Sequence, residues 1–118
     1  MSIVADDCIF CKMVEKNVNA ETVYEDEEVM AFKDLKPQAP VHFLFIPKKH
    51  ISTLNDISCQ DVVLIGNLFA RIKEVAHKKG LDKDGYRVVV NCGKNAGQEV
   101  FHLHAHLLGG RVFSWPPG

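Results

Sequence analysis

The sequence has no apolar run close to the roughly 20 residues that a membrane-spanning helix needs. Its first residues, Met1 to Asp7, are acidic and lack the basic start and apolar block of a secretory signal. Neither sign of charge is in excess, with 14 basic and 15 acidic residues and a formal net charge of -1. We therefore expect a cytoplasmic protein that binds neither membranes nor nucleic acid through a basic surface.

The cysteines are unevenly placed. Of four cysteines, Cys8 and Cys11 form a C-x-x-C pair, whereas Cys59 and Cys92 stand alone. A cytoplasmic location predicts reduced thiols. No second C-x-x-C follows, so the pair alone supplies two of the four ligands that a structural metal site needs. The pair is therefore either half of a metal site or two reduced cysteines on a short helix.

The length and the apolar fraction of 47% fit a single domain over residues 1–118. Alternating and β-branched segments predict strands at 22–25, 28–34, 41–47 and 86–91, and a fifth in the segment 101–110. We expect a short helix at 8–14, capped by Asp7. This order predicts an α+β domain: an antiparallel sheet of about five strands with one long and one short helix.

The long helix is expected to follow a capping box at Ser58 to Asp61 and to end near Gly80. Apolar residues recur there at steps of three and four, which predicts one stripe facing the core. The stripe comprises Val62, Ile65, Leu68, Phe69, Ile72, Val75 and Ala76.

Three histidines, His102, His104 and His106, alternate with apolar residues. In a strand they would share one face, with Leu103, Ala105 and Leu107 on the other, whereas in a helix His104 would point away. A row of imidazoles suits metal ligation, binding of an anionic group or nucleophilic attack.

Residues around the row favour a phosphoester site. Backbone amides of the loop from Gly93 to Gly97 can converge on an oxyanion. Asn91 can offer an amide group, and Asp34 can accept hydrogen bonds from a sugar diol. A histidine beside a donor-rich loop and a carboxylate is a plausible arrangement for phosphoryl chemistry.

The segment His102-Leu103-His104-Ala105-His106-Leu107-Leu108 resembles the signature of the histidine triad (HIT) superfamily. The segments 34–42, 46–51 and 97–102 are also similar to that family. The ending Gly109-Gly110-Arg111, followed by Trp115-Pro116-Pro117-Gly118, resembles the tail of its histidine triad nucleotide-binding (Hint) branch. The resemblance implies one HIT domain over 1–118 with a C-terminal tail at 111–118.

The resemblance further implies a purine nucleoside phosphoramidase that cleaves the P–N bond of adenosine 5′-phosphoramidates. His104 would attack phosphorus and form a nucleotidyl-histidine intermediate. Asp34 would bind the ribose and Leu35 the base, while His106, Asn91 and the backbone of Gly97 to Glu99 would hold the phosphate. The implied nucleotide-binding set is Asp34, Leu35, Asn91, Gly97, Gln98, Glu99, Val100, His104 and His106. Glu99 stands where some members carry a hydroxyl residue.

For the cysteine pair, the resemblance implies a structural zinc ion bound by Cys8, Cys11, His50 and His102, and no organic cofactor. It also implies a homodimer whose C-terminal tail, with Trp115, reaches the neighbouring subunit. Three other functions stay open: a dinucleoside polyphosphate hydrolase, a non-enzymatic nucleotide-binding regulator, and a metalloenzyme with the three histidines as ligands.

Overall fold

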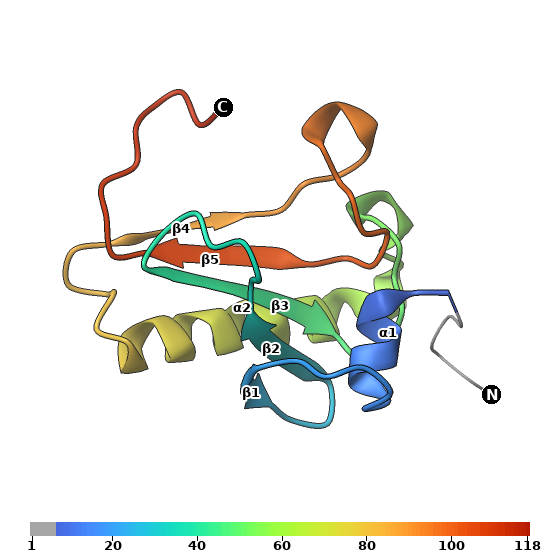
Figure 1. Cartoon of the computed structure of the whole chain (residues 1–118). Coiled ribbons are helices and arrows are strands. Elements are labelled where there is room, and N and C mark those ends of the chain that lie inside the picture. The colour runs from blue at the N-terminus through green and yellow to red at the C-terminus, as the bar shows by residue number, and fades with distance from the viewer. Residues whose placement is uncertain (1–6) are drawn as a thin grey trace.

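The computed structural model describes residues 7–118, which form a five-stranded antiparallel sheet with helices on its two faces (Figure 1). The strands lie in the order β1-β2-β3-β5-β4. Their bounds are Thr22–Glu25 for β1, Val29–Lys33 for β2, Val41–Pro47 for β3, Tyr86–Val89 for β4 and Ala105–Gly109 for β5. Helix α1 spans Ile9–Val14 and α2 spans Val62–Lys78. The predicted α+β fold class is confirmed.

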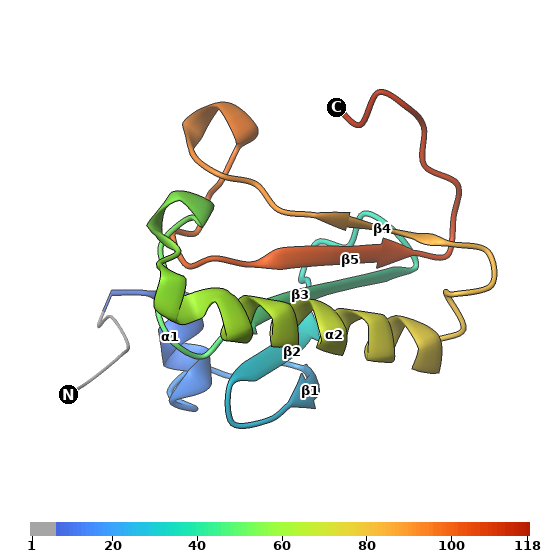
Figure 2. The ribbon, with the colours of Figure 1, turned by 180° about the vertical axis from the view of Figure 1, so that it is seen from behind.

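Strand alternation divides the core into two layers. Phe43 and Phe45 of β3 and Ala105 and Leu107 of β5 belong to the cluster that packs against α2, which lies across this face of the sheet (Figure 2). The next residues along each strand, such as Leu44 and His106, point to the other face. Leu44 and His106 are register partners in adjacent strands.

The short helix α1 covers part of this second face. Phe10 and Cys11 pack with Met30, Phe32 and Leu44, and the Phe10 and Phe32 rings meet edge to face at 5.2 Å. Six residues are too few for a helix to be stable alone, so this packing must hold α1 in place. The side chains of α1 thereby border one end of the sheet face that carries the histidines.

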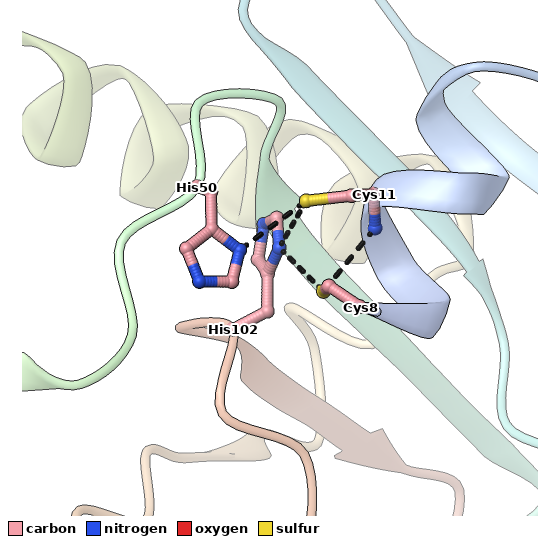
Figure 3. A group of neighbouring side chains, drawn as sticks. All are labelled: Cys8, Cys11, His50 and His102. Carbon is pink, nitrogen blue, oxygen red and sulfur yellow. Dashed lines mark hydrogen bonds between the residues drawn. The ribbon is translucent and has the colours of Figure 1, made fainter. Parts of the chain in front are cut away.

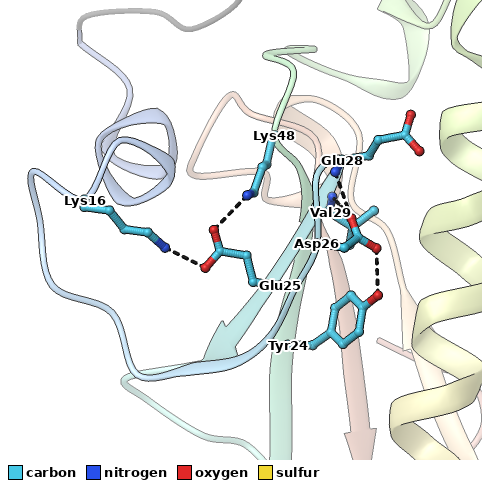
Figure 4. Close-up of polar contacts among 7 residues, drawn as sticks. All are labelled: Lys16, Tyr24, Glu25, Asp26, Glu28, Val29 and Lys48. Atoms are coloured by element: carbon cyan, nitrogen blue, oxygen red, sulfur yellow. Dashed lines mark hydrogen bonds and ion pairs between the residues drawn. The ribbon is translucent and has the colours of Figure 1, made fainter.

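Polar contacts hold the edge strand β1 at its turn (Figure 4). Asp26 accepts the N–H groups of Glu28 and Val29 at 2.8 Å and the Tyr24 hydroxyl at 2.7 Å. Glu25 lies between Lys16 and Lys48, and their hydrogen bonds lower the pKa of its carboxyl group. These pairs remain partly exposed to solvent and contribute little stability, but they link the segments that follow α1 and β3 to β1.

The predicted capping box is confirmed, with one addition. Ser58 and Asp61 exchange the expected hydrogen bonds, but the turn they cap is a 3-10 turn, Cys59–Asp61, from which α2 continues. Asp61 is buried and pairs with Lys49 at 2.6 Å. The start of α2 is thus tied to the chain segment that carries His50. Among residues 7–118, no helix is long and apolar enough to cross a bilayer.

Three local expectations are wrong. The cap of α1 is the Cys8 sulfur rather than Asp7, because Sγ of Cys8 accepts the Cys11 N–H. Val62 and Phe69 of the predicted core stripe are 63% and 46% exposed, because Val62 opens the helix ahead of its first buried residue and Phe69 is turned about 100° from the buried Leu68. The fifth strand begins at Ala105, because the Leu103 N–H bonds the Ile51 carbonyl at 2.6 Å and turns the preceding residues away from the sheet.

Candidate functional site

A cavity of about 860 Å³ opens on the sheet face opposite α2. Its walls come from α1, the end of β2, the start of β3, the loop after β4 and the histidine segment. Most of the residues predicted to bind a nucleotide line it, namely Asp34, Leu35, Asn91, Gly97, Glu99, Val100, His104 and His106. The fold therefore gathers in one place residues that are up to 72 positions apart, from Asp34 to His106.

His104 is oriented by the backbone of its own segment. Its Nδ1 lies 2.7 Å from the carbonyl oxygen of His102, and its ring is buried edge to face against Phe10 at a centroid distance of 5.3 Å. A carbonyl oxygen can only accept, so Nδ1 carries the proton. The lone pair is therefore on Nε2. A buried imidazole whose lone pair faces a cavity can act as a nucleophile or as a base.

His106 is half-buried beside His104, with ring centroids 5.2 Å apart. Burial lowers its pKa to about 4, and the neighbouring His104 and His42 act in the same direction. Burial also lowers the pKa of His42, whose Nε2 is 2.8 Å from Nδ1 of His106. Both rings are consequently neutral at physiological pH.

The loop after β4 presents backbone amides to the cavity. Gly93 and Gly97 adopt positive φ angles of 83° and 81°, which only glycine takes without strain. The amides of Gly97 and Gln98 bond the carbonyls of Lys94 and Gly93. Within residues 7–118, no hydrogen bond uses the amides of Glu99 and Val100, which are therefore the loop's available donors.

Gln98 differs from the prediction. It is buried, it does not line the cavity, and its side chain joins Gly93, Ser52 and Val100 by hydrogen bonds of 2.9 to 3.1 Å. Gln98 therefore braces the loop instead of facing a ligand. The amides left for a ligand are those of Glu99 and Val100, both of which belong to the implied nucleotide-binding set.

Asp34 and Leu35 stand at the opposite wall. One carboxylate oxygen of Asp34 accepts the Lys36 N–H at 2.8 Å, and the other lies 3.4 Å from Nε2 of His42. Each oxygen keeps capacity for another donor. The Leu35 side chain is 93% exposed at the cavity. An exposed leucine beside a carboxylate can cover an apolar ring whose polar substituents reach Asp34.

The cysteine pair meets two histidines at the end of α1 (Figure 3). Ligand atoms of Cys8, Cys11, His50 and His102 lie within 4.8 Å of one another. Nδ1 of His102 is 3.3 Å from Sγ of Cys8 and 3.4 Å from Sγ of Cys11, and Nδ1 of His50 is 3.2 Å from Sγ of Cys11. A tetrahedral zinc centre places sulfur and nitrogen ligands about 3.5 Å apart. The donor set and its spacing fit a metal ion.

The surroundings of these four residues also fit a metal. His102 Nε2 lies 2.8 Å from the Pro47 carbonyl, which fixes its proton there and turns the Nδ1 lone pair to the cysteines. The Cys11 N–H donates to Sγ of Cys8 at 3.3 Å, which holds that sulfur in place. Burial lowers the pKa of His102 to about 4 and keeps the ring neutral. Two cysteines and two histidines complete a tetrahedron and leave no open position.

The three histidines do not form a single row. His102 belongs to the cysteine cluster, whereas His104 and His106 line the cavity. Within the described part of the chain, the groups whose geometry could hold a metal do not include His104. The prediction that all three share one face is therefore wrong, and the hypothesis of a metalloenzyme with three histidine ligands loses its geometric basis.

Sequence reasoning missed His42, Phe10 and Met13, which also line the cavity. His42 alternates with Leu44 and Ile46 in β3, and that alternation could have placed it on the cavity face. Phe10 and Met13 gave no comparable signal, because only the docking of α1 brings them there.

Comparison with known proteins agrees with this geometry. The family model described as HIT domain matches residues 15–113. An uncharacterized HIT-like protein of Synechocystis is 50% identical over 115 residues, which is 98% of this chain and all of the relative. The crystal structure of a HIT family hydrolase from Legionella pneumophila superposes with a TM-score of 0.93 at 49% identity, covering 95% of this chain and 100% of that one.

A histidine triad nucleotide-binding protein from Candida albicans superposes with a TM-score of 0.80 at 30% identity, covering 93% of this chain and 83% of that one. The family match covers His104, His106 and the rest of the cavity lining except Phe10 and Met13, and the similarity to the solved structures extends over nearly the whole chain. The chain belongs to the HIT domain family.

Proposed function

We propose that this protein is a purine nucleoside phosphoramidase of the Hint branch, a hydrolase that cleaves the P–N bond of adenosine 5′-phosphoramidates. One observation carries the proposal: Nε2 of His104 is free at the cavity while the His102 carbonyl holds its Nδ1 proton. The HIT family hydrolase of Legionella pneumophila and the nucleotide-binding protein of Candida albicans, both similar to this chain, support the hydrolase and the nucleotide ligand.

The reaction proceeds in two displacements at phosphorus. Nε2 of His104 attacks, the P–N bond breaks, and the amine leaves with the bonding electron pair and takes a proton from water. The His102 carbonyl stabilises the positive charge that develops on the ring. Water then attacks phosphorus and gives a proton to the hydroxide left by the first step, the bond to Nε2 breaks, and the nucleoside monophosphate leaves while His104 returns to its starting form.

Different walls of the cavity bind different parts of the nucleotide. Asp34 accepts the ribose hydroxyls, and Leu35 packs against the purine. Asn91, the amides of Glu99 and Val100, and His106 surround the phosphate oxygens. The Glu99 side chain is exposed, so its carboxylate can turn to solvent and away from the phosphate.

Zinc is proposed as the ion of the cluster formed by Cys8, Cys11, His50 and His102. When bound, it supplies a structural cross-link and no open coordination position. The four residues join α1 to the segment before His104, so they fix the wall that carries Phe10. Thiolate ligands need reducing conditions, which agrees with a cytoplasmic protein.

Turnover of adenosine 5′-phosphoramidate, measured beside diadenosine tetraphosphate, tests the proposal. We expect the phosphoramidate to be strongly preferred and His104→Asn to lose about a thousandfold or more in kcat while still binding AMP. His77→Asn, an exposed histidine outside the cavity, is the matched control and should keep full activity.

Two results would contradict the proposal, and each would assign another function. Preferred cleavage of diadenosine tetraphosphate would assign a dinucleoside polyphosphate hydrolase. AMP binding without turnover of either substrate would assign a non-enzymatic nucleotide-binding protein.

A further inference from the structure

His42 is a buried histidine of β3 that joins the turn after β2 to His106. The backbone N–H of Gln38 points at Nδ1 of His42 at 3.0 Å. An amide N–H can only donate, so Nδ1 must hold a lone pair. A neutral imidazole has one proton, and in His42 that proton is therefore on Nε2.

The same reasoning extends to His106. Nε2 of His42 lies 2.8 Å from Nδ1 of His106 and 3.4 Å from Oδ2 of Asp34. Because Nε2 carries the proton, it donates to Nδ1 of His106, and that atom must accept. The single proton of neutral His106 is then on Nε2, the nitrogen left for the cavity that His106 lines.

The neutral state of both rings supports this assignment. Burial lowers the pKa of His42 despite the opposing charge of Asp34, and it lowers the pKa of His106 to about 4. At pH 7 each ring therefore carries one proton, and the position of that proton is the remaining variable.

Asp34, His42 and His106 also lie close enough together to hold a metal ion. The Gln38 amide argues against that use. For Nε2 of His42 to bind a metal, the ring proton would have to move to Nδ1 and face the Gln38 N–H, two donors at 3.0 Å. At His102, by contrast, the partner of Nε2 is an acceptor, the Pro47 carbonyl, so the Nδ1 lone pair is left for a metal.

We propose that His42 is a positioning residue that fixes His106 as a hydrogen-bond donor toward a phosphoryl oxygen of the substrate. This proposal rests on the proposed function and adds a defined role for a residue outside the triad. The opposite tautomer of His106 would turn a lone pair toward an anionic oxygen, which is repulsive. Without His42, both tautomers of His106 become accessible, and a fraction of the molecules presents the wrong one.

Two variants of nearly equal size separate the two ends of His42. The side-chain amide of Gln reaches the position of Nε2, so His42→Gln can still donate to His106. The side chain of Asn reaches only the position of Nδ1, so His42→Asn can accept from Gln38 but offers His106 no donor. A purely structural role for His42 predicts that the Asn variant, which satisfies the buried amide, is no worse than the Gln variant.

The first readout is the protonation of the His106 ring, measured by ¹⁵N NMR on histidine-labelled protein. We expect the proton on Nε2 in the wild type and in His42→Gln, and a mixture of tautomers in His42→Asn. A proton on Nδ1 in the wild type, or an unchanged His106 signal in His42→Asn, would overturn the proposal. This readout requires no turnover, and it applies to folded protein whose other histidine signals are unchanged.

The second readout is function, with AMP and adenosine 5′-phosphoramidate as probes. We expect His42→Asn to lose about ten- to a hundredfold in kcat with a smaller change in KM, and about tenfold in AMP affinity, with His42→Gln recovering most of both. Equal losses in the two variants would contradict the proposal. If no phosphoramidate is hydrolysed, the proposed function fails, and the His106 tautomer with AMP affinity still decides the role of His42.

Discussion

Each histidine of the triad is specialised by the partner on its other ring nitrogen. The Pro47 carbonyl turns the Nδ1 lone pair of His102 toward the cysteines. The His102 carbonyl turns the Nε2 lone pair of His104 toward the cavity. Because His42 donates to Nδ1 of His106, the proton of His106 is on Nε2, toward the cavity. In the proposed function, one residue type therefore serves as a metal ligand, a nucleophile and a donor, because neighbouring acceptors and donors set the tautomers.

The low pKa of His106 predicts a pH dependence of stability. Its pKa falls from 6.5 to about 4 on folding, so between these values the unfolded chain binds more protons and stability decreases as pH falls. The shift corresponds to about 3 kcal/mol, which partial solvent exposure reduces to about 2 kcal/mol. Urea denaturation at pH 7 and pH 4 measures how much unfolding free energy is lost on acidification. We expect this loss to be about 2 kcal/mol smaller in His106→Asn than in wild type. Equal losses would refute the assignment.

The sequence predicted the chemistry-bearing residues better than their individual roles. The alternation of His102, His104 and His106 pointed to the candidate site, and Asp34 and Asn91 line the same cavity as His104 and His106. Which histidine faces the cysteines depends on Pro47 and Ile51, whose carbonyls approach only after folding. The bracing role of Gln98 is equally non-local, because its amide bonds Ser52.

At the scale of elements, α1 depends most on contacts outside itself. It has only six residues, and its anchors are Phe10, Cys11 and the sulfur that caps it. A metal ion that binds only the folded state would stabilise that state by about 4 kcal/mol at a thousandfold excess over Kd. We predict close to one zinc ion per chain by elemental analysis, and loss of the metal with lowered Tm when Cys8 and Cys11 are replaced by Ala.

The matched control for this pair is the replacement of Cys59 and Cys92 by Ala, since neither lies in the metal-binding group. That variant should keep its zinc and its Tm. Wild-type protein that is fully stable without metal after expression with ample zinc would contradict the structural role proposed for the ion.

Elements with strong local patterns were predicted closely. Strand β3 has the predicted bounds, because its β-branched and aromatic run is limited by Pro40 and Pro47. The start of β5 was misplaced because no local feature of residues 101–104 reports the bond from Leu103 to Ile51. Periodicity found α2, but it cannot distinguish the part of an apolar stripe that the sheet covers from the part that extends beyond it.

At the scale of the whole molecule, exposed apolar surface favours self-association. Val62, Val63 and Phe69 of α2 are 46% to 74% exposed, and β4 is an edge strand of the sheet. Twofold pairing is the commonest way to cover such features. We predict a homodimer by light scattering, and a shift toward monomer for Phe69→Glu but not for Lys73→Glu on the same helix. A monomeric wild-type protein would refute the assembly.

Hydrogen bonds link the C-terminal tail to the turn that borders the cavity and to β4. Arg111 donates to the Gln38 carbonyl at 2.9 Å, and Arg87 donates to the Ser114 carbonyl at 2.9 Å, while Trp115 remains 81% exposed. We predict that deleting Ser114 to Gly118 leaves the dimer intact and changes the relative rates for phosphoramidates with different leaving amines. An unchanged substrate profile would exclude a role for Trp115 in substrate selection.

The central claim is that His104 forms a covalent bond to phosphorus, and stereochemistry tests it most directly. A single-diastereomer adenosine 5′-phosphoramidothioate, hydrolysed in ¹⁸O-labelled water, gives a chiral phosphorothioate whose configuration ³¹P NMR reads after stereospecific phosphorylation. Two successive in-line displacements predict net retention of configuration, because each one inverts the phosphorus centre. Net inversion would mean that water attacks the substrate directly, and it would contradict the nucleotidyl-histidine intermediate.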